Sequence, residues 1–176
     1  MKRHIVLVGL PGSGKSSVGK LAADQLQGAF IDIDALISRK EGRQISLIFA
    51  EKGEAAFREM EKKEVDAALA GEPSFIAPGG GWAAQPGALE SVAGRAVLVY
   101  LKTKSDTAAG RATASGPGNR PTLIGIGDDP EARMRDLLKE REAFYLKADA
   151  QVETDKKSAE QVATDVVRLA REKAGW

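Results

Sequence analysis

The feature that most constrains the fold of this sequence is a glycine-rich segment directly after its first apolar run. Residues 5–8 read IVLV and residues 9–17 read GLPGSGKSS. A short β-branched run between turn residues is typical of a strand buried in a parallel sheet, and residues 15–26 carry the pattern of a helix. A strand, a turn with the spacing GxxxxGK[ST] and a helix, in that order, predict a phosphate-binding loop (P-loop).

The residue types of this loop suit a nucleoside triphosphate. Gly9, Gly12 and Gly14 allow backbone conformations closed to other residues, so successive N–H groups can turn toward one anion at the positive end of the helix. Lys15 can reach the β- and γ-phosphates, and the Ser16 hydroxyl can bind Mg²⁺. The alternative is a capped glycine turn with a solvated lysine, which the order of the elements disfavours. The predicted nucleotide contacts are Gly12, Ser13, Gly14, Lys15, Ser16 and Ser17.

Strand and helix patterns alternate along the rest of the chain. Further strands are expected at residues 29–33, 74–77, 96–101 and 150–153, and helices at 45–69 (broken near Gly53), 104–112, 131–146 and 159–173. This alternation favours crossover connections and a parallel sheet covered by helices on both faces, an α/β three-layer sandwich. Residues 113–129 are rich in glycine and proline and follow neither periodicity, so we expect a functional loop there.

Composition limits the chemistry and the partners of the chain. With 176 residues, one domain is expected. There is no cysteine and only one histidine, so catalysis must use carboxylates, lysine, arginine, hydroxyls and backbone groups. Lys and Arg total 26 against 25 Asp and Glu, which lacks the basic excess of nonspecific nucleic-acid binders. The first apolar run meets Pro11 too early for a signal peptide or a membrane span, so a cytoplasmic protein without membrane partner is expected.

Four further segments, together with the P-loop, resemble shikimate kinases. They are FIDIDALI at 30–37, IFAEKGEAAFREME at 48–61, PGGGW at 78–82, and RP at 120–121 followed by REAFY at 141–145. The resemblance covers most of the chain and implies the nucleoside monophosphate kinase-like fold, with a five-stranded parallel sheet in a single P-loop kinase domain over residues 1–176. It also implies a mobile lid at about 113–129, a substrate-binding helical region at about 33–61, and ATP and Mg²⁺ as cofactors. We expect the protein to be a monomer.

The resemblance assigns two roles to the carboxylates of FIDIDALI. Asp34 corresponds to the residue that contacts the substrate hydroxyls and is the proposed base, and Asp32 to a residue near Mg²⁺. Their spacing of two would place both carboxylates on one side if the strand continued past Ile33. The alternative for a carboxylate at a strand end is capping of the next helix.

The resemblance also predicts the acceptor site. Arg58 and Arg141 correspond to two arginines that grip the substrate carboxylate, for which paired guanidinium donors are suited. The triplet Gly79, Gly80 and Gly81 would let the substrate approach backbone N–H groups. The alternatives are that the two arginines are solvated surface residues and that the three glycines only form a tight turn. Trp82, where a small residue is expected, either packs into the core or narrows the acceptor site.

Two further arginines are predicted around the nucleotide. Arg120 corresponds to the lid arginine that folds over the transferring phosphate, and closure of such a lid excludes water. Arg111 corresponds to the arginine that stacks on adenine, and residues 152–163 resemble the loop around the base, with contacts expected at 154–158.

Together these observations favour a kinase that phosphorylates a hydroxyl of a carboxylated small metabolite, with shikimate and shikimate 3-phosphate as the expected acceptor and product. Three alternatives remain open: a gluconate-type kinase or one retuned to another polyol acid, a regulator that holds ATP without turnover, and a nucleic-acid remodelling protein. An intact set of site residues argues against lost catalysis, namely Lys15, Ser16, Asp32, Asp34 and Arg120. The absence of a basic stripe argues against nucleic acid.

Overall fold

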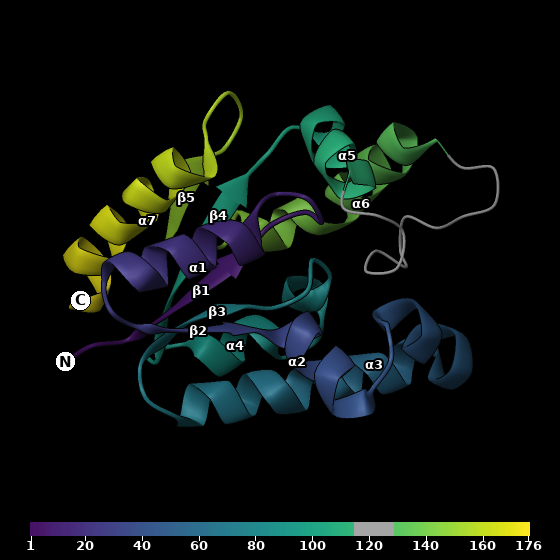
Figure 1. Ribbon diagram of the computed structural model, residues 1–176, viewed down its shortest axis with the longest axis horizontal. Helices are drawn as coiled ribbons and strands as arrows, with labels where there is room; N and C mark the ends of the chain where they lie inside the picture. Colours follow the sequence, from purple (N-terminus) through teal and green to yellow (C-terminus); the bar gives the residue numbers. More distant parts are fainter. Residues whose placement is uncertain (115–128) are drawn as a thin grey trace.

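A five-stranded parallel sheet forms the centre of the molecule (Figure 1). The computed structural model describes residues 1–114 and 129–176, and within them the strand order is β2-β3-β1-β4-β5. The strands are β1 (His4–Val8), β2 (Ala29–Asp32), β3 (Ser74–Ala77), β4 (Ala96–Lys102) and β5 (Ala150–Glu153). Every neighbouring pair runs parallel, which confirms the predicted α/β class.

Helices connect the strands at nearly the predicted positions. They are α1 (Lys15–Gln25), α2 (Ile33–Glu41), α3 (Ile45–Ala70), α4 (Ala88–Val92), α5 (Ser105–Ala114), α6 (Pro130–Tyr145) and α7 (Ala159–Ala174), with a 3-10 turn η1 at Trp82–Ala84. The predicted break in α3 is present, because Gly53 has φ 83° and ψ 167°. The helical patterns did not include α2 and α4, which are only 9 and 5 residues long, although the helical region expected at about residues 33–61 covers α2.

The lid predicted at residues 113–129 needs a partial correction. Thr113 and Ala114 continue α5, and Asp129 is the N-cap of α6, where its carboxylate accepts a hydrogen bond from the Glu131 N–H. The remainder of the predicted lid, including Arg120, lies outside the described residues.

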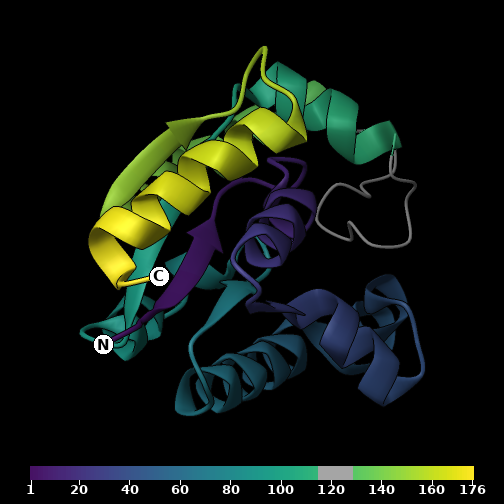
Figure 2. The ribbon, with the colours of Figure 1, turned by 60° about the vertical axis from the view of Figure 1, so that its left-hand side comes forward.

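Two apolar cores cover the faces of the sheet and explain the unbroken apolar strands. In β1, Ile5 and Leu7 pack into the core under α1 and α7, whereas Val6 and Val8 pack into the core under the other helices. Successive side chains of a strand point to opposite faces, so a strand buried on both sides must be apolar throughout. The helices α1 and α7 lie side by side on one face, and α2 and α3 lie at the β2 end of the sheet, away from α7 (Figures 1 and 2).

The parallel topology brings the predicted functional segments to one edge. The P-loop follows β1, Asp32 ends β2, and the glycine triplet follows β3. Since β1 lies between β3 and β4, its carboxyl end is the point where the strand order reverses, which is where ligands bind in open α/β sheets. In the described part of the chain, no helix combines the length and apolar character needed to span a membrane.

The single histidine, His4, begins β1 and so lies at the amino ends of the strands, opposite the predicted site. His4 is 4% exposed, and its Nδ1 accepts a hydrogen bond from the Ser74 N–H at 3.1 Å. A ring nitrogen that accepts from a backbone N–H must be unprotonated. Burial lowers the pKa of His4, and the charge of Arg95 acts in the same direction.

We expect His4 to make the protein less stable in mild acid. Its folded pKa lies below the ordinary value of 6.5, so the unfolded state binds more protons between these two pKa values. The free energy of unfolding should therefore fall as the pH drops from 6.5 through the folded pKa. Urea unfolding at pH 7.5 and 5.5 should show a larger loss for the wild type than for His4→Gln, which cannot titrate. An NMR titration midpoint of the imidazole at or above 6.5 would contradict this expectation.

Candidate active site

The P-loop has the conformation that its glycines predict. Gly12 and Gly14 have φ of 80° and 96°, in the left-handed region that L side chains rarely adopt. A Cβ on Gly12 would also overlap the carbonyl oxygen of Ala108 in α5, so the loop packs directly on that helix. Lys15 is buried, and its ammonium donates hydrogen bonds to the carbonyl oxygens of Gly9 and Leu10, both at 2.8 Å.

Asp32 joins the loop to the second strand. Its Oδ2 accepts a hydrogen bond of 2.5 Å from the Ser16 hydroxyl, while its Oδ1 accepts one of 3.1 Å from the Ala35 N–H and caps α2. The two sequence-based readings of Asp32, capping and function, are therefore compatible, since each uses a different oxygen. A hydroxyl and a carboxylate next to a phosphate loop fit Mg²⁺, which proteins commonly hold with one or two carboxylates and the substrate phosphates.

Asp34 reaches the site by a different route from the one expected. The strand ends at Asp32 and Ile33 begins α2, so Asp34 lies in the first turn of that helix. Its carboxylate nevertheless points to the glycine triplet, because a Cβ on Gly79 would lie 3.1 Å from Asp34 Oδ1. The condition under which both carboxylates would share one strand face is therefore not met, although both lie at the same edge of the sheet.

Arg58 and Arg141 converge from two helices on Gly81. Arg58 comes from α3 and Arg141 from α6, 83 residues apart in sequence, and their side chains are largely buried. A Cβ on Gly81 would overlap Arg58 Nη2 and lie 3.0 Å from Arg141 Nη2. Arg58 Nε and Arg141 Nη1 are buried and have no hydrogen-bond partner within residues 1–114 and 129–176. Buried guanidinium groups of this kind suit a bound carboxylate, which can accept from both.

Glu61, a residue with no role predicted from the sequence, is fully buried in this cluster. Its Oε1 accepts a 2.8 Å hydrogen bond from Arg58 Nη1, and its Oε2 accepts one of 3.0 Å from the Gly79 N–H. Burial raises the pKa of the Glu61 carboxyl, and the charges of Arg58 and Arg141 oppose that rise. The spacing of three between Arg58 and Glu61 in a helical segment was the signal that could have revealed this contact.

Two further residues singled out from the sequence, Arg111 and Trp82, lie in the described part of the chain. Arg111 in α5 donates hydrogen bonds of 3.2 Å to the Thr154 hydroxyl and carbonyl, which joins it to the loop after β5 that the sequence predicts around adenine. Trp82, the first residue of η1, is 2% exposed and packs in the apolar core, which is the first of the two alternatives left open by the sequence.

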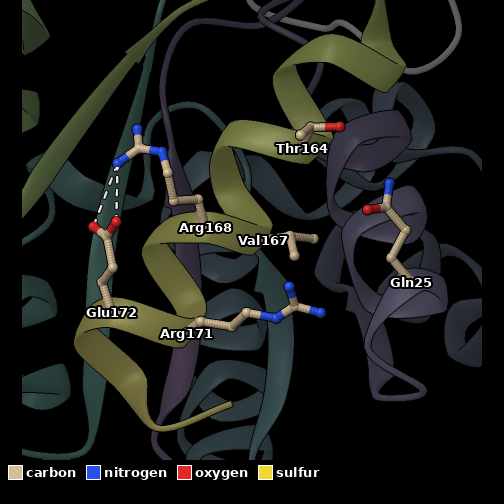
Figure 3. A pocket seen from close by; sticks show the side chains of 6 residues that line it. All are labelled: Gln25, Thr164, Val167, Arg168, Arg171 and Glu172. Carbon is tan, nitrogen blue, oxygen red and sulfur yellow. Dashed lines mark hydrogen bonds and ion pairs between the residues drawn. The ribbon is translucent and has the colours of Figure 1, made fainter.

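A separate hollow of about 440 Å³ lies between α1 and α7 (Figure 3). It is lined by Gln25, Thr164, Val167, Arg168, Arg171 and Glu172, none of which belongs to the predicted site. Arg168 in its wall pairs with Glu172 at 3.3 Å. The hollow therefore has no part in the arrangement described above.

Comparison with known proteins identifies the family. The family model described as shikimate kinase matches residues 11–171. Similar relatives include the shikimate kinase of Chlorobium chlorochromatii, 40% identical over 95% of this chain and 88% of the relative, and that of Symbiobacterium thermophilum, 36% identical over 97% of both. The solved shikimate kinase of Acinetobacter baumannii in complex with shikimate is 33% identical, with a TM-score of 0.90 over 98% of this chain and 94% of that one. The chain therefore belongs to the shikimate kinase family.

Proposed function

We propose that this chain transfers the γ-phosphate of ATP to a hydroxyl of shikimate and forms shikimate 3-phosphate. The observation that carries the proposal is the convergence of two buried arginines on Gly81, at the same sheet edge as the P-loop. Two residues earlier, Gly79 lies beside the Asp34 carboxylate. This arrangement suits an acceptor that carries a carboxylate and a hydroxyl on opposite sides. Family membership supports shikimate as that acceptor.

The nucleotide side of the proposal uses the P-loop and α5. Backbone N–H groups of residues 12–17 would surround the phosphates at the N-terminus of α1, and Lys15 would exchange its carbonyl partners for phosphate oxygens. Arg111 would pack against adenine from the position that its hydrogen bonds to Thr154 fix. Ser16 and Asp32 would hold Mg²⁺, which would neutralise charge on the phosphates.

The acceptor side would use Arg58, Arg141 and Asp34. The two guanidinium groups would hold the carboxylate, and Asp34 would orient the attacking hydroxyl and receive its proton. Because phosphoryl transfer has a loose transition state, placement of the nucleophile in line with the leaving group matters more than early removal of its proton. The sequence further predicts that Arg120, in the lid, would fold over the transferring phosphate.

Glu61 would act on the acceptor through Arg58 and Gly79. Its two oxygens bind one donor of each, so it holds the guanidinium at a fixed distance from the glycine segment. A long arginine side chain loses less freedom on binding when its orientation is already fixed.

The function is tested by measuring ADP release with shikimate, gluconate, other hydroxy acids and no acceptor. We expect turnover with shikimate far above all the others, and a product with phosphate on the 3-hydroxyl by ³¹P NMR. Preference for gluconate would favour the gluconate-type alternative, and ATP binding without turnover on any acceptor would favour the regulator.

Replacement of Asp34 should separate chemistry from nucleotide binding. Asp34→Asn removes the proton acceptor and weakens placement of the hydroxyl, so kcat should fall by roughly a hundredfold or more. The affinity for ATP, measured by calorimetry, should remain that of the wild type because the P-loop is intact. The matched control is Asp66→Asn, an exposed carboxylate paired with Lys62 in α3, which should leave kcat unchanged. Equal kcat values for Asp34→Asn and the control would remove Asp34 from the mechanism.

Replacement of Arg58 should affect the acceptor and spare ATP. Arg58→Ala removes one carboxylate donor and leaves Glu61 buried without its cation, so kcat/KM for shikimate should fall by about 2–5 kcal/mol in transition-state free energy. The KM for ATP should change far less. Arg168→Ala, which removes an exposed arginine of α7, provides the control for loss of a guanidinium. An equal rise of both KM values for Arg58→Ala would contradict the assignment.

A further inference from the structure

Tyr145 is a fully buried residue at the end of α6 that the mechanism above does not use. Its hydroxyl donates a hydrogen bond of 2.5 Å to the carbonyl oxygen of Gly80, 65 residues earlier in the sequence. Its ring stacks on Tyr100 of β4, with centroids 5.1 Å apart. The side chain thus joins the last turn of α6 to the central residue of the glycine triplet.

The Gly80 carbonyl belongs to the peptide that joins Gly80 to Gly81 in the predicted acceptor site. The carbonyl of Gly80 and the N–H of Gly81 belong to one planar trans peptide, so fixing one fixes the direction of the other. Gly81 is the residue on which Arg58 and Arg141 converge. On its other side Gly80 meets the P-loop, because a Cβ there would lie 2.8 Å from Pro11 Cδ. The hydroxyl of Tyr145 therefore holds a peptide that lies between the arginines and the phosphate loop.

Tyr145 also lies beside one of those arginines. Arg141 precedes it by four residues in α6, so the two side chains share a helix face. Burial raises the pKa of Tyr145 to about 12, against the opposing charges of Arg141 and Arg58. At neutral pH the hydroxyl is therefore protonated and remains a donor to Gly80.

We propose that Tyr145 is a positioning residue for the acceptor, whose hydroxyl fixes the Gly80–Gly81 peptide and the Arg141 guanidinium in one geometry for the substrate carboxylate. This inference rests on the proposed function, since it names the carboxylate of shikimate as the group that is positioned. Tyr145 itself touches protein groups and acts through them.

Tyr145→Phe removes the hydroxyl and keeps the stacked ring. We expect the Kd for shikimate, measured by calorimetry, to rise roughly three- to tenfold, the net worth of about one hydrogen bond. The KM for ATP should stay close to that of the wild type, whereas the thermal midpoint should fall by roughly a few degrees because the buried Gly80 carbonyl loses its donor. The matched control is Tyr100→Phe, which removes a hydroxyl from the other ring of the same stack and leaves the bond to Gly80 intact.

A double-mutant cycle separates positioning from a general effect on packing. If Tyr145 acts through Arg141, the Tyr145→Phe effect on the shikimate Kd should nearly vanish in an Arg141→Met background. A Tyr145→Phe effect of equal size in both backgrounds, an unchanged Kd in the wild-type background, or an equal effect of Tyr100→Phe would each overturn the proposal.

A second measurement leaves the hydroxyl in place. The sequence contains two tyrosines, so incorporation of 3-fluorotyrosine into Tyr100→Phe labels Tyr145 alone. Its ¹⁹F resonance should move on addition of shikimate and remain fixed on addition of ADP, and a resonance that shikimate leaves unmoved would overturn the proposal. A wild type that does not phosphorylate shikimate would overturn the proposed function and this inference together, whereas an active wild type with an unaffected Tyr145→Phe variant would overturn the inference alone.

Discussion

The site depends on how closely other groups approach the backbone of residues 79–81. A side chain on Gly79 would meet Glu61 and Asp34, one on Gly80 would meet Pro11, and one on Gly81 would meet both arginines. None of these glycines has a positive φ, so their identity reflects space rather than backbone conformation. One short segment after β3 is thus the surface on which groups from the P-loop, α2, α3 and α6 are assembled, and any Cβ there would push at least one of them away.

Buried charge is the second condition that the site has to meet. Arg58, Glu61 and Arg141 are removed from water together, and unpaired charges in such surroundings are costly. Glu61 offsets part of that cost for Arg58 through a direct ion pair, and its second oxygen accepts a hydrogen bond from the Gly79 N–H. Arg58 also pairs with the more exposed Glu54 at 3.3 Å, whereas Arg58 Nε and Arg141 Nη1 have no hydrogen-bond partner in the described part of the chain and could donate to a carboxylate ligand.

The sequence predicted the fold well because its signals were local. An apolar run is enough to place β1 or β4, and the glycines of the P-loop fix the turn that follows. The prediction failed where two local preferences compete, as at Ile33, where strand pairing yields to a helix capped by Asp32. The contacts of Glu61 and Tyr145 with the glycine triplet were beyond the sequence patterns, because they join residues 18 and 65 positions apart and depend on sheet order.

The ammonium of Lys15 is already held inside the loop by two carbonyl oxygens. A side chain in this state has given up most of its rotational freedom in the folded protein, so a nucleotide that captures it meets a cation whose ordering is complete. The phosphate oxygens of an incoming nucleotide would replace the neutral carbonyl acceptors of the Lys15 ammonium, while its nitrogen stays in place. Nucleotide recognition by Lys15 would thus be an exchange of hydrogen-bond partners, in which the side-chain entropy is lost on folding and not on binding.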